Sequence, residues 1–356
     1  MTEETKVSLP LLTNSRMSCA RTCRRKHYLM YEVGLRRIRS ADALRFGSGF
    51  HLGLDVKGKG ATDEEAIEKA TAGYDICPQW ANPDDWELER VILATMLAGH
   101  FWRYSQDNLQ FIATEQQFRM PIVNPETGAR SRTFEAAGKI DGIVTLQDGR
   151  QAVLEYKTTS DDLAPESDYW LRLRCDGQIS LYVLAARHAG FRVDTVLYDV
   201  TRKPTIRPKL IPTLDIHGKK IVIDTAGQRV FKKDGSPRES ASEKDGWVVQ
   251  QTRETPAQFG ERLLQDIGER PDFYFQRREV PRLQAELDEF EAELWQQAQA
   301  IRDSQLSGRW FKNVSALTCD FCEYKDLCLN SVAVNPASPP AGFEIVANVH
   351  QELATE

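Results

Sequence analysis

The sequence predicts a mixed α/β fold, in which a helical N-terminal region precedes a mixed β-sheet core flanked by helices. Two observations lead to this prediction. Apolar residues recur at helical spacing through residues 11–109, and from residue 111 the pattern changes to that of strands. The chain also has 356 residues, of which 41% are hydrophobic, and this is enough to enclose a sizeable core.

In the first part of the chain, helices are expected over residues 11–39, 41–57, 62–73 and 84–109. Ser15 is the expected N-cap of the first helix. The second helix contains Gly47, Gly49 and Gly53, each of which weakens a helix by about 1 kcal/mol. Close packing of the backbone against a neighbouring element would offset this cost.

In the middle of the chain, strands are expected over residues 111–123, 133–146, 152–158 and 193–200, and a helix over residues 169–189. The segment Gln147–Arg150 contains Asp-Gly and is typical of a hairpin turn between two of these strands. The order is therefore strand, strand, strand, helix, strand, which is that of a mixed α/β core.

The last part of the chain is less regular. Residues 205–250 are polar and rich in glycine, and they indicate an inserted β-ribbon or a mobile loop. A helix should begin at Thr255–Pro256, and a longer one should cover residues 281–302. No period is present after Asn330, which indicates a poorly ordered tail or a peripheral arm. The expected regions are residues 1–110, 111–204, 205–250, 251–330 and 331–356.

Charge and hydropathy exclude some classes of protein. The net charge of −6 argues against a general nucleic-acid coat protein, but a nuclease contacts the DNA backbone through a local patch and is not excluded. No stretch approaches the ~20 apolar residues of a membrane helix, and no signal peptide is visible at the N-terminus. We therefore expect a cytoplasmic protein with no membrane contact.

A basic patch is predicted near the N-terminus. The span from Arg16 to Arg45 contains nine Lys or Arg residues and only two acidic ones, Glu32 and Asp42. A solvated helix face is one explanation, and a surface that follows a phosphate backbone is the other. The candidate DNA-binding residues are Arg16, Arg21, Arg24, Arg25, Lys26, Arg36 and Arg37.

Two carboxylates and a lysine carry the predicted chemistry. Asp141 lies on one strand of the hairpin, and Glu155 and Lys157 lie on the next. Because side chains alternate along a strand, Glu155 and Lys157 face the same side and can meet Asp141 across the hairpin. Such a carboxylate pair suits Mg²⁺ or Mn²⁺, which would activate water for attack on a phosphodiester. The alternative is a turn aspartate beside an exposed Glu–Lys pair.

Three further residues can join this site. His51 lies on the glycine-bearing helix and could complete a metal shell, although a lone histidine is more often a hydrogen-bonded core residue. Gln178 and Tyr182 are one helical turn apart and could hydrogen-bond to a phosphate or to Lys157, although helix packing explains the same spacing.

Seven cysteines form a second pattern. Cys319, Cys322 and Cys328 have the spacing C-x2-C-x5-C, and a fourth ligand would have to come from Cys19 or Cys23 near the N-terminus. Four thiolates can hold a [4Fe–4S] cluster or a tetrahedral Zn²⁺. Disulfides are not expected in a cytosolic protein. The two other cysteines, Cys77 and Cys175, are expected to be buried apolar residues.

The order His51, Asp141, Glu155-x-Lys157, Gln178-x3-Tyr182 resembles the RecB-like branch of the PD-(D/E)XK nuclease superfamily, from about Leu12 to Cys328. The resemblance implies the restriction-endonuclease-like fold and a role for each residue. The metal ligands would be His51, Asp141, Glu155 and the backbone carbonyl of Tyr156. Lys157 would support activation of water, and Gln178 and Tyr182 would assist at the site.

The cysteines resemble those of iron–sulfur members of the same branch, which include AddB-type helicase–nucleases, CRISPR adaptation nucleases and many phage-encoded nucleases. Such members take one cysteine from an N-terminal helix and three from a C-terminal C-x2-C-x5-C. Their N-terminal cysteine precedes a basic and aromatic run like the one after Cys23, which implies Cys23 as the fourth ligand. Many of them have proline where this chain has Arg24, so Cys19 stays an alternative. The cluster would join the two ends of the chain.

These patterns together predict a metal-dependent DNA nuclease of the phage or prophage type, most simply an exonuclease that acts on single-stranded DNA or DNA ends. The alternative is a DNA-end-binding or scaffolding subunit of a larger recombination or repair complex, with little activity of its own. A helicase or recombination partner and an oligomer are both compatible with the sequence. A small-molecule hydrolase is disfavoured because the chain has no nucleophile elbow and no phosphate-binding loop.

Overall fold

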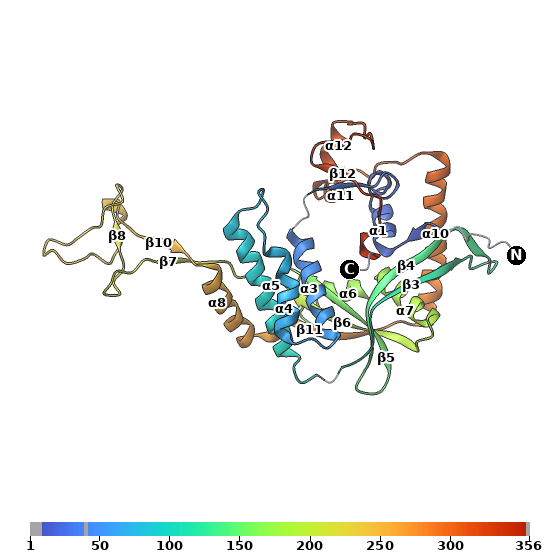
Figure 1. The fold of residues 1–356 in the computed structure, drawn as a ribbon, viewed down its shortest axis with the longest axis horizontal. Coiled ribbons are helices and arrows are strands. Elements are labelled where there is room, and N and C mark those ends of the chain that lie inside the picture. The colour runs from blue at the N-terminus through green and yellow to red at the C-terminus, as the bar shows by residue number, and fades with distance from the viewer. Residues whose placement is uncertain (1–8, 39–41, 108, 354–356) are drawn as a thin grey trace.

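The computed structural model describes residues 9–38, 42–107 and 109–353, which form a six-stranded mixed sheet with helices on both faces and an arm that projects from one side (Figure 1). The strand order is β1-β4-β5-β6-β11, with β3 paired to β4. The strands of this sheet are β1 (Leu11–Leu12), β3 (Gln110–Val123), β4 (Arg130–Thr145), β5 (Gln151–Thr159), β6 (Val193–Arg202) and β11 (Phe275–Pro281). Among the described residues, no helix has the length and apolar character needed to cross a membrane.

The central strands follow the predicted order. β3 and β4 are antiparallel, and β4 turns into the antiparallel β5 at the expected hairpin, where Gly149 has a φ of 85°. β5 and β6 are parallel, so the chain must cross over between them, and it does so through α6 and α7. The sequence did not indicate β11, which pairs antiparallel with β6 at the edge of the sheet.

Two hydrophobic cores cover the two faces of the sheet. One is formed mainly by α1, α6, α7 and α10, and the other mainly by α3, α4, α5 and α8. The helices are α1 (Asn14–Thr22), α2 (Arg24–His27), α3 (Asp42–Gly58), α4 (Asp63–Thr71), α5 (Pro83–Arg103), α6 (Asp168–Leu173), α7 (Gly177–His188), α8 (Pro256–Glu269), α9 (Pro271–Tyr274), α10 (Gln284–Ser307), α11 (Ala316–Asp320) and α12 (Lys325–Leu329). The catalytic candidates on β4 and β5 therefore come from a strand pair that is covered on both sides.

The single helix predicted over residues 11–39 is wrong. The side chain of Thr13, and not that of Ser15, accepts the N–H of Arg16 and caps α1, while the two residues before it extend the sheet as β1. Cys23 then adopts an extended backbone and separates α1 from α2. The chain continues as a π-helical turn (Tyr28–Glu32) and the short strand β2 (Leu35–Arg37).

Other predicted helices differ in their ends. The helix expected over 169–189 is split into α6 and α7, because Asp176 accepts the N–H of Gln178 and starts a new helix. The helix expected over 84–109 ends at Arg103, and the one expected over 281–302 is α10. The start at Thr255–Pro256 is confirmed, since Thr255 and Gln258 form a capping box.

The two ends of the chain are joined by a third small core. Leu29, Leu35 and Tyr324 are buried together, and the Tyr324 hydroxyl donates a hydrogen bond of 2.6 Å to the Leu35 carbonyl. Strand β12 (Phe343–Ile345) pairs with β2, so the segment after Asn330 runs as a peripheral arm across the N-terminal segment. A short 3₁₀ turn (Gln351–Leu353) follows β12.

The glycines of α3 allow close approach to α5, as the sequence predicted. A Cβ atom at Gly49 would lie 2.7 Å from Leu93 Cδ2, and one at Gly53 would lie 2.7 Å from Leu97 Cδ1. Both leucines are fully buried, so they have little room to move. This contact fixes α3, which carries His51, against the rest of the fold.

Replacing Gly53 with valine is expected to lower the free energy of unfolding by about 1–3 kcal/mol, because the added side chain overpacks the α3–α5 contact. Gly268 is the matched control: it lies on the exposed side of α8, and a Cβ there would meet nothing within 4 Å. Gly268→Ala should raise stability by about 0.5–1 kcal/mol. Thermal unfolding of both variants checks this, and equal midpoints would contradict the close contact.

Candidate active site

The catalytic candidates gather where β4 and β5 separate. The β4–β5 ladder runs from the Thr145–Gln151 pair to the Gly142–Leu154 pair and then stops. One residue further on, the Asp141 side chain takes the place of the ladder, because its Oδ2 accepts the Tyr156 N–H at 2.8 Å. The N–H and C=O of a strand residue point to the same side. The Tyr156 carbonyl therefore faces the gap that Asp141 occupies.

Glu155 and Lys157 join Gln178 and Tyr182 in one hydrogen-bonded chain on the α7 side of the sheet. Lys157 Nζ lies 2.7 Å from both Glu155 Oε1 and Gln178 Oε1. The Gln178 amide donates to Glu155 Oε1 at 2.9 Å and to the Tyr182 hydroxyl at 3.0 Å. The fold thus brings together the four side chains whose spacing in the sequence suggested that they could meet. Asp176, which the sequence reasoning missed, caps α7 and fixes the position of Gln178.

In this group of four hydrogen-bonded side chains, one carboxylate oxygen is left without a partner. Glu155 is 2% exposed, and its Oε2 is buried with no hydrogen bond. Burial raises the pKa of Glu155 to about 7, Lys157 opposes this and nearby Asp141 adds to it. A buried carboxylate oxygen without a donor is costly, and a divalent cation is the kind of partner that would satisfy it.

His51 approaches Asp141 from α3. Its Nδ1 lies 3.6 Å from Asp141 Oδ1, and its ring meets the Tyr156 ring edge-on at 6.1 Å. Asp141 thus has one oxygen toward an imidazole and the other on a backbone amide. Although burial opposes ionisation of Asp141, His51 and the Tyr156 N–H outweigh it and lower the pKa of the carboxyl group. Asp141 is therefore held as a carboxylate.

The donor set has the chemistry of a site for a hard divalent cation: two carboxylates, an imidazole and a backbone carbonyl. The free Glu155 oxygen fits such a group. Within residues 9–38, 42–107 and 109–353, however, no three His, Cys, Asp or Glu side chains are grouped closely enough to hold a metal ion. The donors are neighbours, but in this conformation they do not form a closed coordination shell.

Comparison with known proteins identifies the family. Residues 12–329 match the family model described as the PD-(D/E)XK nuclease superfamily. The chain belongs to this superfamily. A search of curated proteins finds no match. Among solved structures, the chain is similar to one described as "Crystal structure of SSO0001", with 8% identity over 94% of this chain and 90% of that chain, and a TM-score of 0.31; a score this low supports no argument.

The name of the superfamily describes a motif, and its letters can be compared with the residues of this PD-(D/E)XK chain. Asp141 has the residue type of the first acidic letter in the superfamily's name, and Glu155, Tyr156 and Lys157 have the residue types of its (D/E)XK run. Ile140 stands where the superfamily's name has proline. The mixed sheet with helices on both faces is consistent with the fold of this superfamily.

A buried charged group lies behind the motif and was missed from the sequence. Asp199, which is opposite Tyr156 in the β5–β6 register, accepts hydrogen bonds from His100 at 2.9 Å and from Arg277 at 2.8 Å. Burial opposes ionisation, but these two partners together lower the pKa of Asp199 to about 2. The group ties α5 and β11 to the strand next to the site. Its members are 99 and 78 residues from Asp199, so no local pattern could reveal it.

The four candidate cluster cysteines of the PD-(D/E)XK chain come from the two ends that the third core joins. Cys23 Sγ accepts the N–H of Asn313 at 3.4 Å, and two residues later the Arg25 N–H bonds the Phe311 carbonyl at 2.9 Å. Cys322 packs against the same small core. All seven cysteines are free. Cys175 is exposed in the turn between α6 and α7, so its expected burial is wrong, and Cys77 is half-buried.

Only some residues of the predicted basic patch lie on the surface of the protein. Arg16 is 4% exposed, donates to the Leu11 carbonyl at 2.9 Å and pairs with Glu32 at 2.7 Å. The Arg36 guanidinium donates hydrogen bonds to backbone carbonyls, among them that of Val349 at 3.0 Å. Burial lowers the pKa of Arg24, whose Nη1 is buried. Of the candidate DNA-binding residues, Arg21 and Arg37 are exposed, and Arg24, Arg25, Lys26 and Arg36 are half-buried.

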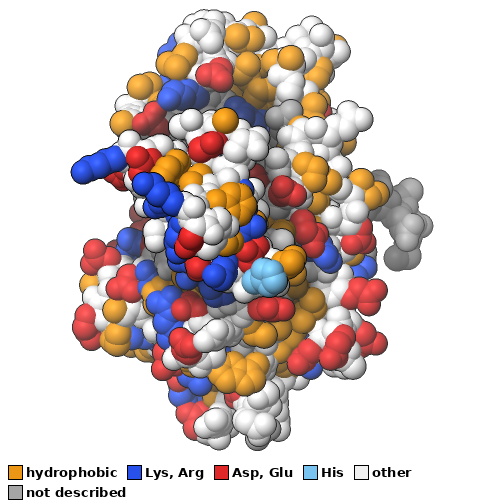
Figure 2. Space-filling view, turned by 90° about the vertical axis from the view of Figure 1, so that its left-hand side faces the viewer, with side chains coloured by type: hydrophobic (Ala, Val, Ile, Leu, Met, Phe, Trp, Pro, Cys, Tyr) orange, Lys and Arg blue, Asp and Glu red, His pale blue; other side chains and the backbone are white. Residues whose placement is uncertain are grey.

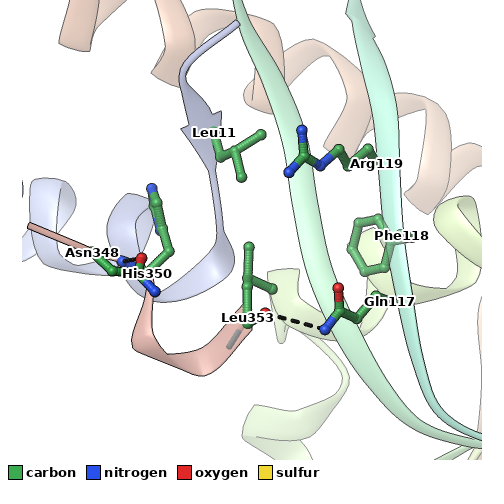
Figure 3. A pocket seen from close by; sticks show the side chains of 7 residues that line it. All are labelled: Leu11, Gln117, Phe118, Arg119, Asn348, His350 and Leu353. Carbon is green, nitrogen blue, oxygen red and sulfur yellow. Dashed lines mark hydrogen bonds between the residues drawn. The ribbon is translucent and has the colours of Figure 1, made fainter. Parts of the chain in front are cut away.

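A hollow is drawn in Figure 3. It has a volume of about 330 Å³ and lies between β1, β3 and the C-terminal segment. The Gln117 amide donates to the Leu353 carbonyl across it at 3.1 Å. None of the predicted catalytic residues lines this hollow, so we assign it no part in the chemistry.

Arg16 and His27 make the N-terminal segment sensitive to acid. Arg16 Nε donates to His27 Nε2 at 3.2 Å, so this nitrogen must be unprotonated, and His27 is fully buried. Burial, with the charges of Arg16 and Arg24, lowers the pKa of His27 to about 3. Between pH 6.5 and 3 the unfolded chain therefore binds a proton that the folded chain does not. Stability must fall as the pH falls through this window.

The contribution of His27 is expected to lower the free energy of unfolding by up to about 2–3 kcal/mol between pH 6.5 and pH 4.5. His27→Gln keeps an acceptor for Arg16 and should remove this part of the pH dependence. Urea unfolding of both proteins at several pH values measures it. The same loss of stability in both proteins would show that His27 is not the responsible group.

Proposed function

We propose that this PD-(D/E)XK chain is a Mg²⁺- or Mn²⁺-dependent DNA nuclease of the RecB-like branch that hydrolyses phosphodiester bonds, acting as an exonuclease on single-stranded DNA or DNA ends. One observation carries the proposal. Glu155 is buried with Oε1 fixed by Lys157 and Gln178 while Oε2 has no partner, beside Asp141 and His51. A carboxylate held in this way has one oxygen free to bind a cation.

His51, Asp141, Glu155 and the Tyr156 carbonyl would hold the cation. When bound, it would stabilise the charge that develops on the phosphate during displacement. The protein's own groups prepare the rest of the site. Burial disfavours the charge of Lys157, but Glu155 outweighs it and raises the pKa of the ammonium group. Lys157 is therefore a cation that can bind the phosphate and orient water.

Gln178 and Tyr182 position these groups. The amide of Gln178 contacts both Lys157 and Glu155, so it fixes the distance between the ammonium group and the carboxylate. Tyr182 accepts the second amide hydrogen and is itself 8% exposed. Both side chains thus act through their neighbours, and Arg21, Arg25, Lys26 and Arg37 are the basic residues available to contact the DNA backbone.

We also propose that Cys23, Cys319, Cys322 and Cys328 bind a [4Fe–4S] cluster, with Zn²⁺ as the alternative. Four thiolates from the two ends of the chain match either group in number and kind. The contacts of Cys23 with Asn313 and of Tyr324 with Leu35 support the proposal, because they bring the two cysteine-bearing segments together.

Digestion of end-labelled single- and double-stranded DNA tests the function. We expect cleavage with Mg²⁺ or Mn²⁺ and none with EDTA, and release of mononucleotides or short products from one end. DNA circles that are cut as fast as linear DNA would contradict the exonuclease assignment. Tight binding of DNA ends without cleavage under any metal would instead favour a DNA-end-binding or scaffolding subunit.

A further inference from the structure

An arm built from residues 203–253 projects from the body of the protein (Figure 1). It leaves the end of β6 and returns into α8, and its base is a ribbon of β7 (Leu210–Pro212) and β10 (Gln251–Arg253). Further out, β8 (Val222–Ile223) pairs with β9 (Val248–Val249), next to a short 3₁₀ turn (Glu243–Asp245). The function proposed above uses none of these residues.

The arm is an ordered chain of tight turns that encloses almost no core. Asp215, Asp224 and Asp234 each accept backbone N–H groups of their own turn, and each turn has a glycine with a φ near 75–79°. Val222 is the one apolar side chain of the arm that is buried. Packing therefore does not explain why this segment is kept as a structured projection.

The charge of the arm is opposite to that of the whole chain. Residues 203–253 contain eleven Lys or Arg and six Asp or Glu, whereas the chain as a whole contains 46 and 52. Several of the acids are engaged locally: Asp215 pairs with Arg229 at 2.5 Å, and Asp224 and Asp234 accept hydrogen bonds within their turns. Four exposed lysines make no ion pair, namely Lys220, Lys232, Lys233 and Lys244. Figure 2 views the molecule from the side of the arm and shows Lys and Arg side chains gathered in the middle of this face.

The root of the arm is fixed close to the catalytic strand. Lys157 is opposite Val200 in the β5–β6 register, and the Lys203 N–H bonds the Thr159 carbonyl at 2.7 Å. The arm thus begins three residues after the partner of the catalytic lysine. On its other side, the buried Glu254 accepts from Arg262 at 2.7 Å and from the Lys209 N–H at 3.0 Å. These contacts hold the direction in which the arm leaves the sheet.

We infer that the arm binds the phosphate backbone of the DNA substrate away from the point of cleavage. The inference deepens the proposed function and rests on it. An ordered ribbon with unpaired lysines is complementary to a phosphate backbone, and it starts at the end of β6, the strand next to the one that carries Glu155 and Lys157. DNA that extends from the site along the arm therefore meets a positively charged surface, which increases affinity for long substrates and leaves the chemical step unchanged.

The test is the quadruple variant K220Q/K232Q/K233Q/K244Q of the full chain. Binding of a fluorescent DNA longer than the body is measured by anisotropy in EDTA over a range of salt concentrations. We expect Kd to rise roughly tenfold or more at about 0.15 M salt, and the salt slope to fall by about 1–3, since each lost phosphate contact removes about 0.9. Cleavage of an oligonucleotide of about six nucleotides, too short to span both surfaces, should stay at the wild-type rate.

Two controls come from the same arm. The quadruple Lys→Arg variant keeps the charge and should bind like the wild type. Glu243→Gln removes an exposed negative charge and should leave Kd unchanged or lower it. An unchanged Kd and salt slope in the Lys→Gln protein would overturn the inference, and so would a change of oligomeric state with normal DNA binding, which would make the arm a contact between copies. If the wild type binds DNA through the arm but never cleaves it, the proposed function fails and the arm inference stands.

Discussion

Glu155→Gln is expected to reduce DNA cleavage at least about 10³-fold while the fold stays intact, because stabilisation worth several kcal/mol is lost and each 1.36 kcal/mol is a factor of ten. The substitution keeps the size of the side chain and an oxygen for Lys157 and Gln178. What it removes is the negative charge and the free Oε2 that would bind the cation. Cleavage of end-labelled DNA with Mn²⁺ measures the rate, and calorimetric titration with Mn²⁺ measures the loss of metal binding.

Glu279→Gln is the matched control for this variant. Glu279 lies on β11, two strands from β5 in the same sheet, where it pairs with Arg150 at 2.5 Å. Its loss should leave both cleavage and Mn²⁺ binding near the wild-type values, since an exposed pair contributes little. Lys157→Met should separate the two functions: Mn²⁺ binding is expected to persist and cleavage to fall. Wild-type cleavage by a homogeneous Glu155→Gln protein would remove Glu155 from the site.

The part of the site that lies on regular elements could be predicted from the sequence. Period 2 along β5 puts Glu155 and Lys157 on one side, and period 3.6 along α7 puts Gln178 and Tyr182 on another shared face. A hairpin with a recognisable turn fixes which strand meets β5. These periodicities depend only on local sequence, and the hydrogen bonds among the four side chains agree with them.

The rest depends on contacts between distant residues. Arg16 looks like part of a basic surface in the sequence, but it is buried because Glu32, His27 and the Leu11 carbonyl surround its guanidinium. β11 looks unsuitable for a strand because it contains Arg277 and Glu279. It is stable at the sheet edge because Asp199, 78 residues away, pairs with Arg277. Neither partner can be found without the fold.

The break at Cys23 is a third case, and it bears on the choice between Cys19 and Cys23 as cluster ligand. In a continuous helix both cysteines would lie on one face, so spacing alone leaves them equivalent. In the fold, Cys23 is in an extended link between α1 and α2 and accepts the Asn313 N–H. Cys19 lies within α1, and burial raises the pKa of its thiol to about 12. Of the two, Cys23 is the one whose Sγ accepts a backbone N–H from the C-terminal segment.

Cys23→Ser is therefore expected to abolish the brown colour and broad visible absorbance of a [4Fe–4S] protein, and to lower the yield of soluble chain. Cys19→Ser should keep the wild-type spectrum and iron content. Cys175→Ser, at an exposed position in the turn after α6, is the control for the loss of a thiol and should change nothing. Absorbance spectra with iron and sulfide analysis, on proteins purified without oxygen, measure all three.

The outcomes separate the alternatives for this site. Loss of iron in Cys19→Ser alone would reverse the choice of ligand. Zinc in place of iron in the wild type would keep the four ligands and change the metal. Because the third core already joins Tyr324 to Leu35 through packing and a hydrogen bond, the two ends should stay in contact even in Cys23→Ser. A soluble, colourless Cys23→Ser protein that still cleaves DNA would show that the cluster stabilises this junction and takes no part in the chemistry at Glu155.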